Sequence, residues 1–264
     1  GRRRGLWFDA RLQNFIELDP KAEERGNVID GLEVALGIGG ARPRSVTMIG
    51  LGAGVLPRRL TEAAPELATT SIEIDPEVVR TAERFFRFAP DANDRVIVGD
   101  GRRELARQVE TTDVIVLDAF YADSVPFHLM TKEFDELCAS KLSERGVYAA
   151  NFAGALSGER NALFWAAVKT LRQVFPSVYI LSPELAAGQP TFSGATVLLA
   201  TRSPDRLDPG TIRDRGVQVA EWLRRPPAAY WATQVYDREL KLADVPLLTD
   251  AYSPTDALQY FRRK

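Results

Sequence analysis

SVTMIGLGAG, residues 45–54, carries the strongest structural signal in this 264-residue chain. Its first half is an apolar run with β-branched residues, which predicts a buried strand. Its second half predicts a tight turn before a helix that begins near Val55. The glycines of the turn are Gly50, Gly52 and Gly54. Because glycine has no Cβ, a ligand can approach the backbone here, and the first N–H groups of the helix point toward it.

SIEID, residues 71–75, follows at the spacing of a second parallel strand. It places Glu73 at the end of that strand, nineteen residues after Gly54. A carboxylate at this point can accept hydrogen bonds from both hydroxyls of a ribose. A turn that only joins a strand to a helix is the alternative, but it does not explain the acidic strand end. The two segments together predict a nucleoside-binding site.

The rest of the chain alternates short β-branched runs with amphipathic helical stretches, which indicates an α/β fold with helices on both faces of a sheet. We expect seven strands, near residues 45–50, 70–74, 95–99, 113–118, 146–151, 177–181 and 195–200. They predict a doubly wound, mostly parallel, Rossmann-like sheet. The expected organisation is an N-terminal β-hairpin appendage over residues 1–30, a Rossmann-like nucleoside-binding domain over 31–205 and a helical extension of the same unit over 206–264.

Several local elements have clear signals. A hairpin is expected around Asp9 and Ala10, and helices over residues 28–37 and near 211–224. The helix after the second strand has Asp75 as N-cap and a proline at its first position. Its apolar stripe should pack on the sheet and comprises Val78, Val79, Ala82, Phe85 and Phe86.

Composition excludes several kinds of partner. Basic and acidic residues nearly balance, with a formal net charge of −2, so no basic field is available for a nucleic acid. No apolar run reaches the ~20 residues that cross a bilayer, and the first residues lack the apolar segment of a secretory signal. We therefore expect a cytoplasmic protein without a membrane partner. Cys138 lies in an apolar helical pattern, which predicts a core position. It is the single cysteine of the sequence, which excludes an internal disulfide and a thiolate metal cluster.

Two further carboxylates end predicted strands, on the edge where open α/β sheets bind ligands. Asp100 follows the third strand and precedes Gly101, so a flat adenine would find both an acceptor for its amino group and room to lie. Capping the next helix is the alternative role for Asp100. Asp118 ends the fourth strand, DVIVLD at residues 113–118. A charge at the end of such an apolar strand is costly unless it is used.

In this order the segments resemble the spermidine synthase-like family, which comprises polyamine aminopropyltransferases and relatives with the class I S-adenosylmethionine-dependent methyltransferase fold. The resemblance runs from about residue 5 to residue 182 and rests on LWFDARLQ (6–13), GLGAG (50–54) with Arg58, IEID (72–75), GDG (99–101) and DVIVLD (113–118). It implies that Glu73 holds the ribose, Asp100 the adenine, and that Gln13 reaches the nucleoside from the hairpin. It also implies S-adenosylmethionine or its decarboxylated form as cofactor, no metal, and a homodimer, which the apolar hairpin favours.

Two departures from the family pattern bear on the reaction. The family's aminopropyltransferases have an aspartate inside the glycine turn, which pairs with the ammonium of the decarboxylated cofactor, where this chain has Ala53. They also have Asp-x-x-Asp at the end of the fourth strand, and here only Asp118 of that pair remains, with Tyr121 in the second place. Each charge-assisted hydrogen bond contributes on the order of 1.5–3 kcal/mol, so a dicationic polyamine would be held weakly. An uncharged Ala53, in contrast, tolerates the carboxylate of intact S-adenosylmethionine.

Transfer from a sulfonium to an amine or hydroxyl needs in-line positioning and a base that takes one proton. Asp118 is the first candidate for this base, and Asp123 and His128, which follow the fourth strand, are the others. Packing of a loop is the alternative for His128. Tyr121 and Asn151 are candidates for the acceptor pocket, and loop capping is the alternative for Asn151.

The sequence thus predicts a spermidine-synthase-like transferase that moves a methyl or other sulfonium-borne group to a small-molecule acceptor. A genuine polyamine aminopropyltransferase, with Asp123 replacing the missing aspartate, is the first alternative. A non-catalytic nucleoside-binding module is the second. A nicotinamide dehydrogenase is disfavoured because Gly-x-Gly-x-Gly departs from the dinucleotide pattern Gly-x-Gly-x-x-Gly.

Overall fold

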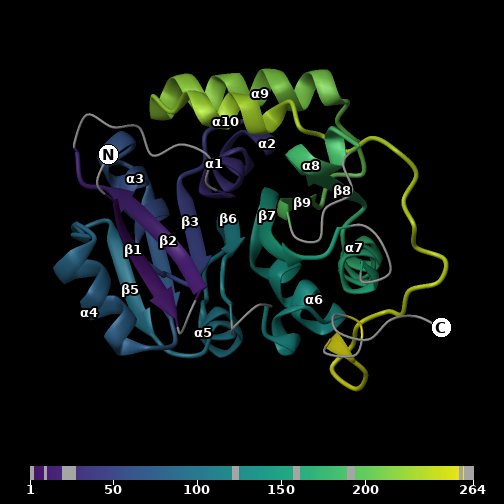
Figure 1. Ribbon diagram of the computed structural model, residues 1–264, viewed down its shortest axis with the longest axis horizontal. Coiled ribbons are helices and arrows are strands. Elements are labelled where there is room, and N and C mark those ends of the chain that lie inside the picture. Colours follow the sequence, from purple (N-terminus) through teal and green to yellow (C-terminus); the bar gives the residue numbers. More distant parts are fainter. Residues whose placement is uncertain are drawn as a thin grey trace.

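The computed structural model describes residues 3–8, 11–19, 28–120, 125–156, 161–188, 194–255 and 258. These residues form a two-stranded sheet and a seven-stranded sheet flanked by helices (Figure 1). The strands of the large sheet are β3 (Ser45–Ile49), β4 (Ala68–Glu73), β5 (Asp94–Val98), β6 (Thr112–Leu117), β7 (Leu142–Gly154), β8 (Ser177–Leu181) and β9 (Gly194–Thr201). Their order is β5-β4-β3-β6-β7-β9-β8, and β9 runs opposite to the other six strands. The predicted α/β fold with a mostly parallel, seven-stranded sheet is confirmed.

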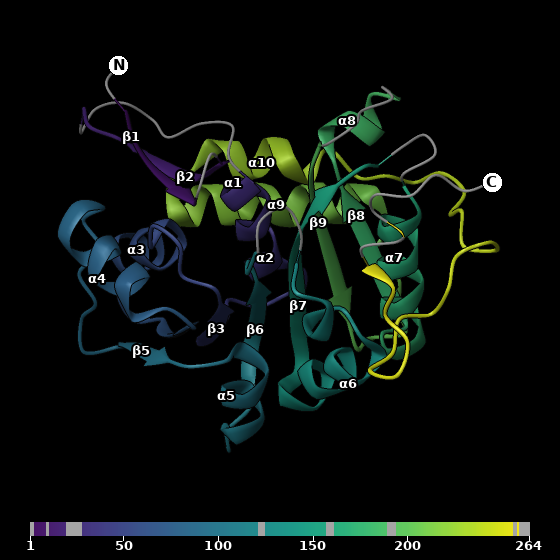
Figure 2. The ribbon, with the colours of Figure 1, turned by 60° about the horizontal axis from the view of Figure 1, so that its bottom comes forward.

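Helices cover both faces of this sheet (Figures 1 and 2). The core on one face includes residues of α1 (Val28–Glu33), α2 (Ala35–Ile38), α3 (Val55–Ala63), α9 (Pro209–Leu223) and α10 (Pro226–Ala232). The core on the other face includes residues of α5 (Gly101–Arg107), α6 (Lys132–Lys141) and α7 (Ala162–Val174). The remaining helices are α4 (Pro76–Phe85), the 3-10 helix η1 (Phe127–Leu129) and α8 (Pro183–Ala186).

Strand β6 shows why the sequences of the strands are apolar at successive positions. Val114 and Val116 belong to the first core, whereas Ile115 and Leu117 belong to the second. Side chains of a strand alternate between the two faces of a sheet, and both faces are buried here. An apolar residue is therefore favoured at every position until the strand reaches the ligand edge.

Helix α4 begins as the sequence predicts. The Asp75 carboxylate accepts a hydrogen bond from the Glu77 N–H at 2.8 Å, and Pro76 occupies the first helical position. Most of the apolar stripe is buried, but the prediction for Phe85 is wrong, since this residue is 43% exposed. Phe85 lies at the edge of the buried arc, and its ring packs against the Arg84 guanidinium, 5.1 Å from the ring centroid.

The N-terminal hairpin consists of β1 (Arg3–Phe8) and β2 (Arg11–Glu17), which pair antiparallel with Phe8 opposite Arg11. This confirms the predicted β appendage, while the turn at Asp9 and Ala10 lies outside the described residues. Ile16 is fully buried in the core that includes α3, so the hairpin is fastened to the main sheet unit (Figure 2). On the outer side, Trp7 and Leu12 face each other across the strands and are exposed. A dimer formed through this surface stays a prediction.

The segment after α10, residues 233–255, crosses the molecule as a strap beside α7 and α6 (Figure 1). The Thr170 hydroxyl of α7 accepts a hydrogen bond from the Leu248 N–H at 3.0 Å. Further along, Asp250 forms a two-armed ion pair with Arg102 of α5, both contacts being 2.7 Å. We call residues 233–255 the C-terminal strap, and its end brings Thr255 to the carboxyl edge of the sheet.

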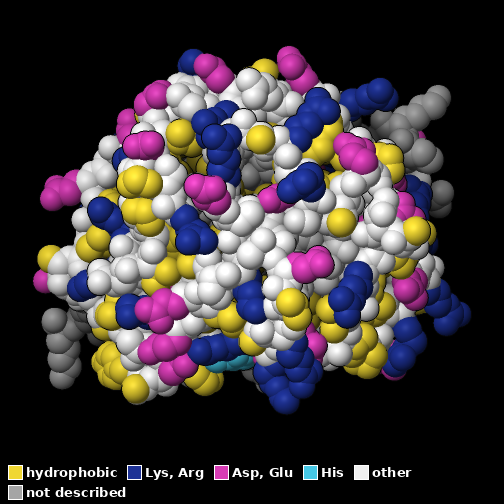
Figure 3. Space-filling model, turned by 180° about the vertical axis from the view of Figure 1, so that it is seen from behind, with side chains coloured by type: hydrophobic (Ala, Val, Ile, Leu, Met, Phe, Trp, Pro, Cys, Tyr) yellow, Lys and Arg dark blue, Asp and Glu magenta, His cyan; other side chains and the backbone are white. Residues whose placement is uncertain are grey.

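Basic and acidic side chains are interspersed over most of the face in Figure 3, in keeping with the balanced composition. Within the described residues, none of the helices combines the length and apolar character that crossing a bilayer requires.

Candidate functional site

A cavity of about 550 Å³ lies at the carboxyl edge of the large sheet. Its centre is the end of β3, where the chain order reverses between the neighbours β4 and β6, and such a switch point is where open α/β sheets bind ligands. The predicted site residues that line it are Gln13, Gly50, Gly52, Glu73, Asp100, Gly101, Asp118, His128 and Asn151. The structure therefore brings the tips of four strands and the hairpin to one place.

The three glycines of the β3–α3 turn have different roles. All three have positive φ angles, +95° at Gly50, +55° at Gly52 and +66° at Gly54, a region that side-chain-bearing residues rarely adopt. A Cβ on Gly50 would collide with the Asp118 carbonyl oxygen, and one on Gly54 would meet the Phe88 side chain at 2.8 Å. A Cβ on Gly52 would have no atom within 4 Å. Gly50 and Gly54 thus allow the turn to form, whereas Gly52 leaves backbone open toward the cavity.

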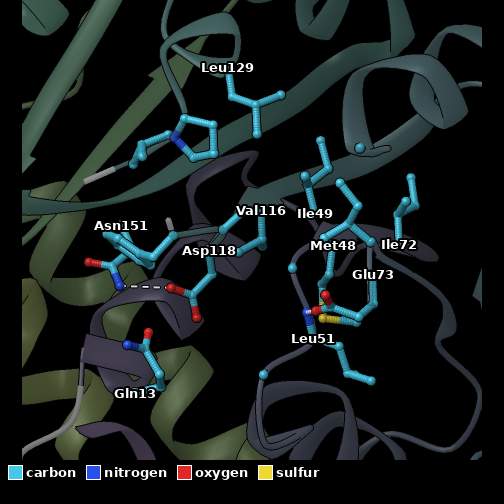
Figure 4. Close-up of a pocket in the computed structure, with 18 of the residues that line it drawn as sticks. Gln13, Met48, Ile49, Leu51, Ile72, Glu73, Val116, Asp118, Leu129 and Asn151 are labelled. Atoms are coloured by element: carbon cyan, nitrogen blue, oxygen red, sulfur yellow. Dashed lines mark hydrogen bonds between the residues drawn. The ribbon is translucent and has the colours of Figure 1, made fainter. Parts of the chain in front are cut away.

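Glu73 is held in a fixed orientation at the end of β4. It is 8% exposed, and its Oε2 accepts a hydrogen bond from the Leu51 N–H at 2.9 Å while its Oε1 accepts from the Asp75 N–H at 3.1 Å. A carboxylate offers about four acceptor positions, so each oxygen keeps one for a ligand. Figure 4 shows Glu73 beside Leu51 on one side of the cavity. The arrangement suits two neighbouring hydroxyl groups.

Asp100 caps the helix that follows it, and its role toward adenine stays a prediction. Its Oδ1 caps α5 by accepting a hydrogen bond from the Arg103 N–H at 2.9 Å, and its Oδ2 lies 3.3 Å from His128 Nε2. A Cβ on the next residue, Gly101, would collide with the side chain of Ile49. The backbone at Gly101 is therefore pressed against β3. His128, a candidate base, is paired with Asp100 at this end of the cavity, and its catalytic role stays a prediction.

Asp118 and Asn151 form the polar pair at the other end of the cavity. Asn151 Nδ2 donates a hydrogen bond to Asp118 Oδ1 at 2.7 Å, and Figure 4 shows Gln13 beside them. Burial raises the pKa of Asp118 above its ordinary value, and the hydrogen bond from Asn151 opposes this by lowering it. Asn151 lies within β7, opposite Val197 of β9, and is 8% exposed. The loop-capping interpretation of Asn151 is therefore wrong, because the residue belongs to a strand and faces Asp118.

Some candidates do not reach the cavity or cannot be placed. Tyr121 and Asp123 lie outside the described residues, so their roles stay predictions. Gly54 supports the turn without lining the cavity. Arg58 pairs with Glu62 at 3.1 Å and lines a different pocket.

Sequence reasoning missed the apolar wall of the cavity and the contribution of the C-terminal strap. Ile74 lines the cavity and is 69% exposed, directly after the buried Glu73. The SIEID segment shows an apolar residue directly after the carboxylate, but a single exposed apolar residue does not by itself indicate a ligand. Thr255 also lines the cavity, and nothing in its sequence neighbourhood indicates this.

The arrangement offers a carboxylate for a base amino group at Asp100, beside Gly101. It also offers a carboxylate for a diol at Glu73 and a proton acceptor at Asp118. Within the described ranges no cluster of three or more His, Cys, Asp or Glu residues is placed to hold a metal ion.

Comparison with known proteins agrees with this geometry. Residues 34–206 match the family model described as the spermine/spermidine synthase domain. The chain is 30% identical to a polyamine aminopropyltransferase of Vibrio vulnificus, over 83% of this chain and 71% of that protein. It is 33% identical to an N-terminal histidine N-methyltransferase of Emericella nidulans, over 63% of this chain and 29% of that protein. A probable spermidine synthase from Corynebacterium glutamicum has a similar fold, with a TM-score of 0.64 and 21% identity over 89% of this chain and 88% of that one. The resemblance found in the sequence is confirmed, and the chain belongs to the spermine/spermidine synthase domain family.

Proposed function

We propose that this chain is a transferase that binds S-adenosylmethionine in the cavity and moves a methyl, or another sulfonium-borne group, to a small amine or hydroxyl acceptor. Transferases of both kinds, aminopropyl and methyl, are among its relatives. The observation that carries the proposal is the distribution of charge in the cavity. The described carboxylates that line it are Glu73, Asp100 and Asp118, and only Asp118 lies at the acceptor end.

The nucleoside part of the ligand fits the other two carboxylates. Glu73 keeps one acceptor position on each oxygen for the ribose hydroxyls, since each oxygen is held by one backbone N–H. Asp100 accepts from the adenine amino group beside Gly101, and the exposed Ile74 packs on the face of the base. These contacts place the sulfonium toward β6 and Asp118.

The glycine turn favours the carboxylated form of the cofactor. Ala53 has an uncharged side chain, and this methyl group is buried beneath the turn, so it puts no negative charge near the cavity. The first residues of α3, Val55 and Leu56, line the cavity. The N-terminus of a helix carries a partial positive charge and free N–H groups, which bind a carboxylate and repel an ammonium. Both features support intact S-adenosylmethionine over the decarboxylated form.

Asp118 is the proton acceptor in this proposal. When bound, the sulfonium supplies an electrophilic carbon and a neutral thioether as leaving group. Asp118 Oδ takes the proton that the acceptor loses, and Asn151 holds the carboxylate in place through the 2.7 Å hydrogen bond. Gln13 and Thr255 line the same cavity from the hairpin and the strap, where they limit the size of the acceptor.

A polyamine aminopropyltransferase is the second candidate, and the 30% identity with the Vibrio vulnificus protein of that name favours it. A polyamine acceptor carries two or more ammonium groups, and these need carboxylates beyond Asp118. Among the described residues of the acceptor end none is present, so this function depends on Asp123.

Calorimetric titration with the two cofactor forms tests the proposal. We expect S-adenosylmethionine to bind at least about tenfold more tightly than the decarboxylated form, a difference of about 1.4 kcal/mol, because only the former has a carboxylate for the α3 N-terminus. The nucleoside 5′-methylthioadenosine, which lacks the amino-acid part, is the control and should bind more weakly than S-adenosylmethionine. A preference for the decarboxylated form, with turnover of putrescine, would establish the second candidate instead. Tight binding without transfer to any amine or hydroxyl compound would indicate a non-catalytic module.

A further inference from the structure

A second, much smaller cavity of about 30 Å³ lies behind the acceptor end of the site. Asn151 lines both this cavity and the large one, so its side chain forms part of the wall between them. The face of Asn151 that meets Asp118 is visible in Figure 4. Most of the residues that line the small cavity are apolar, and the polar ones besides Asn151 are Asp135 and Tyr148.

Asp135 is a buried carboxyl group that the site described so far does not use. It lies in the first half of α6 and is 3% exposed, and no hydrogen bond to its carboxyl group is found within the described part of the chain. Burial raises the pKa of Asp135 well above its ordinary value, and the neighbouring Glu136 and Glu133 of the same helix raise it further. A raised pKa favours the protonated form of this carboxyl group, which has one O–H to donate.

The buried titratable groups that face Asp135, Cys138 and Tyr148, favour their neutral forms as well. Cys138 follows it by one turn on α6, and Tyr148 faces it from β7. Burial raises the pKa of each well above its ordinary value, and the charge of Arg102 of α5 offsets only part of this rise for Cys138. The ring of Tyr148 stacks on Phe175, with 5.8 Å between the centroids, which fixes its hydroxyl group. No charged partner within this buried cluster compensates a charge on Asp135.

The small cavity has the size and the lining that a buried water requires. A water needs roughly 10–15 Å³ of such volume and two to four polar partners. The cavity provides about 30 Å³ and three polar side chains, Asp135, Tyr148 and Asn151. An apolar lining alone would leave the space dry, whereas these three groups can provide a water with three hydrogen bonds, the usual number for a buried water.

We propose that Asp135 is a positioning residue of the site, which acts through a water held in the small cavity: the water donates to the amide oxygen of Asn151 and so holds Nδ2 on Asp118. The inference rests on the proposed role of Asp118 as the proton acceptor. A primary amide has a donor end and an acceptor end of nearly equal shape, and its hydrogen-bond partners decide which end faces which way. With a donor on the cavity side, the amide nitrogen faces Asp118. Without it, the amide can turn, and its oxygen would then oppose the Asp118 carboxylate.

Two substitutions of Asp135 test this coupling. Asp135→Leu removes the polar group, and Asp135→Asn keeps a donor of the same size. We expect Asp135→Leu to move the titration of Asp118 to higher pH by about one unit, a tenfold change in its protonation equilibrium, because the opposing hydrogen bond from Asn151 is weakened. Asp135→Asn should leave that titration nearly unchanged. Glu136→Gln is the matched control, since it changes a charge next to Asp135 on α6 without lining the cavity, and it should also leave the titration of Asp118 in place.

The readout is the carboxyl carbon resonance of Asp118 in isotope-labelled protein, assigned with the Asp118→Asn variant. The acid limb of kcat against pH should shift by the same amount. The NMR titration does not depend on turnover. If the chain transfers no group, the proposed function is overturned, but the effect of Asp135 on the titration of Asp118 can still be measured. An unchanged Asp118 titration in Asp135→Leu would overturn the inference.

Thermal unfolding distinguishes a positioning role of Asp135 from a purely structural role. Because the folded state holds the proton of Asp135 more tightly than the unfolded state, the wild type loses stability as pH rises from the ordinary pKa of a carboxyl group toward the raised one. Asp135→Leu lacks this loss, so its Tm should match or exceed that of the wild type at pH 7 while its Asp118 titration is shifted. If Asp135→Leu does not fold, Tyr148→Phe removes the hydroxyl from the same cavity and should shift the Asp118 titration in the same direction by less. No shift in Tyr148→Phe would then count against the water.

Discussion

Asp118→Asn is expected to lower turnover about 10³-fold, since general-base catalysis by a positioned side chain contributes about 10²–10⁴-fold. An asparagine at this place keeps the shape of the side chain and a hydrogen bond to Asn151, but it cannot take a proton. The dissociation constant of S-adenosylmethionine should stay within about threefold of the wild-type value, because the nucleoside is held by other residues. Single-turnover kinetics together with calorimetry measure the two effects separately.

The dependence of kcat on pH should also differ between the wild type and Asp118→Asn. Only the ionised carboxylate accepts a proton, and burial raises the pKa of Asp118. The wild type should therefore lose kcat as pH falls through a value above the usual range of an aspartate, and Asp118→Asn should lack this limb. Asp113→Asn, at the opposite end of β6, removes the same charge away from the cavity and serves as the control. Retained turnover in Asp118→Asn would remove Asp118 from the mechanism.

Glu73→Ala is expected to weaken cofactor binding about 10²-fold or more, because two hydrogen bonds to a charged group are lost at about 1.5–3 kcal/mol each. The substitution also leaves the Leu51 and Asp75 N–H groups without their acceptor, so Tm should fall as well. Glu73→Gln keeps part of the geometry but presents an N–H₂ to one of these backbone donors, and its affinity should be intermediate. Calorimetric titration with S-adenosylmethionine provides the measurement.

Glu77→Gln is a suitable control for this experiment. Glu77 lies four residues further on, is exposed and pairs with Arg80 rather than lining the cavity. Its substitution should leave the affinity for the cofactor unchanged. An affinity of Glu73→Ala equal to that of the wild type would show that the nucleoside does not lie on this carboxylate.

The parts of the site that could be predicted from the sequence are those that follow from the sheet itself. Glu73, Asp100 and Asp118 end three parallel strands, and the carboxyl ends of parallel strands lie on one edge of the sheet. An acidic residue after an apolar run is therefore visible in the sequence, and its position in space follows once the strands are assigned. The glycine turn is visible for the same reason, since positive φ angles favour glycine.

The parts that could not be predicted depend on contacts between segments far apart in the chain. Thr255 lines the cavity at the end of a strap that is held by α7, through Thr170, and by α5, where Arg102 pairs with Asp250, 148 positions further along the chain. Asp135 follows Phe134 on a helix, and the pattern alone gives no reason to place this carboxyl in the core. The pairing of His128 with Asp100 likewise depends on how η1 returns to the cavity. These features are set by tertiary packing, which local periodicity does not report.

We propose that the strand tips hold an adenosine with its sulfonium end directed at Asp118. A crystal structure of the chain with S-adenosylhomocysteine, the product of methyl transfer, tests it most directly. We expect both ribose hydroxyls within hydrogen-bond distance of Glu73, the adenine beside Asp100 and Gly101, and the sulfur on the side of Asp118 and Asn151. A ligand bound outside this cavity, or one whose ribose makes no contact with Glu73, would contradict it.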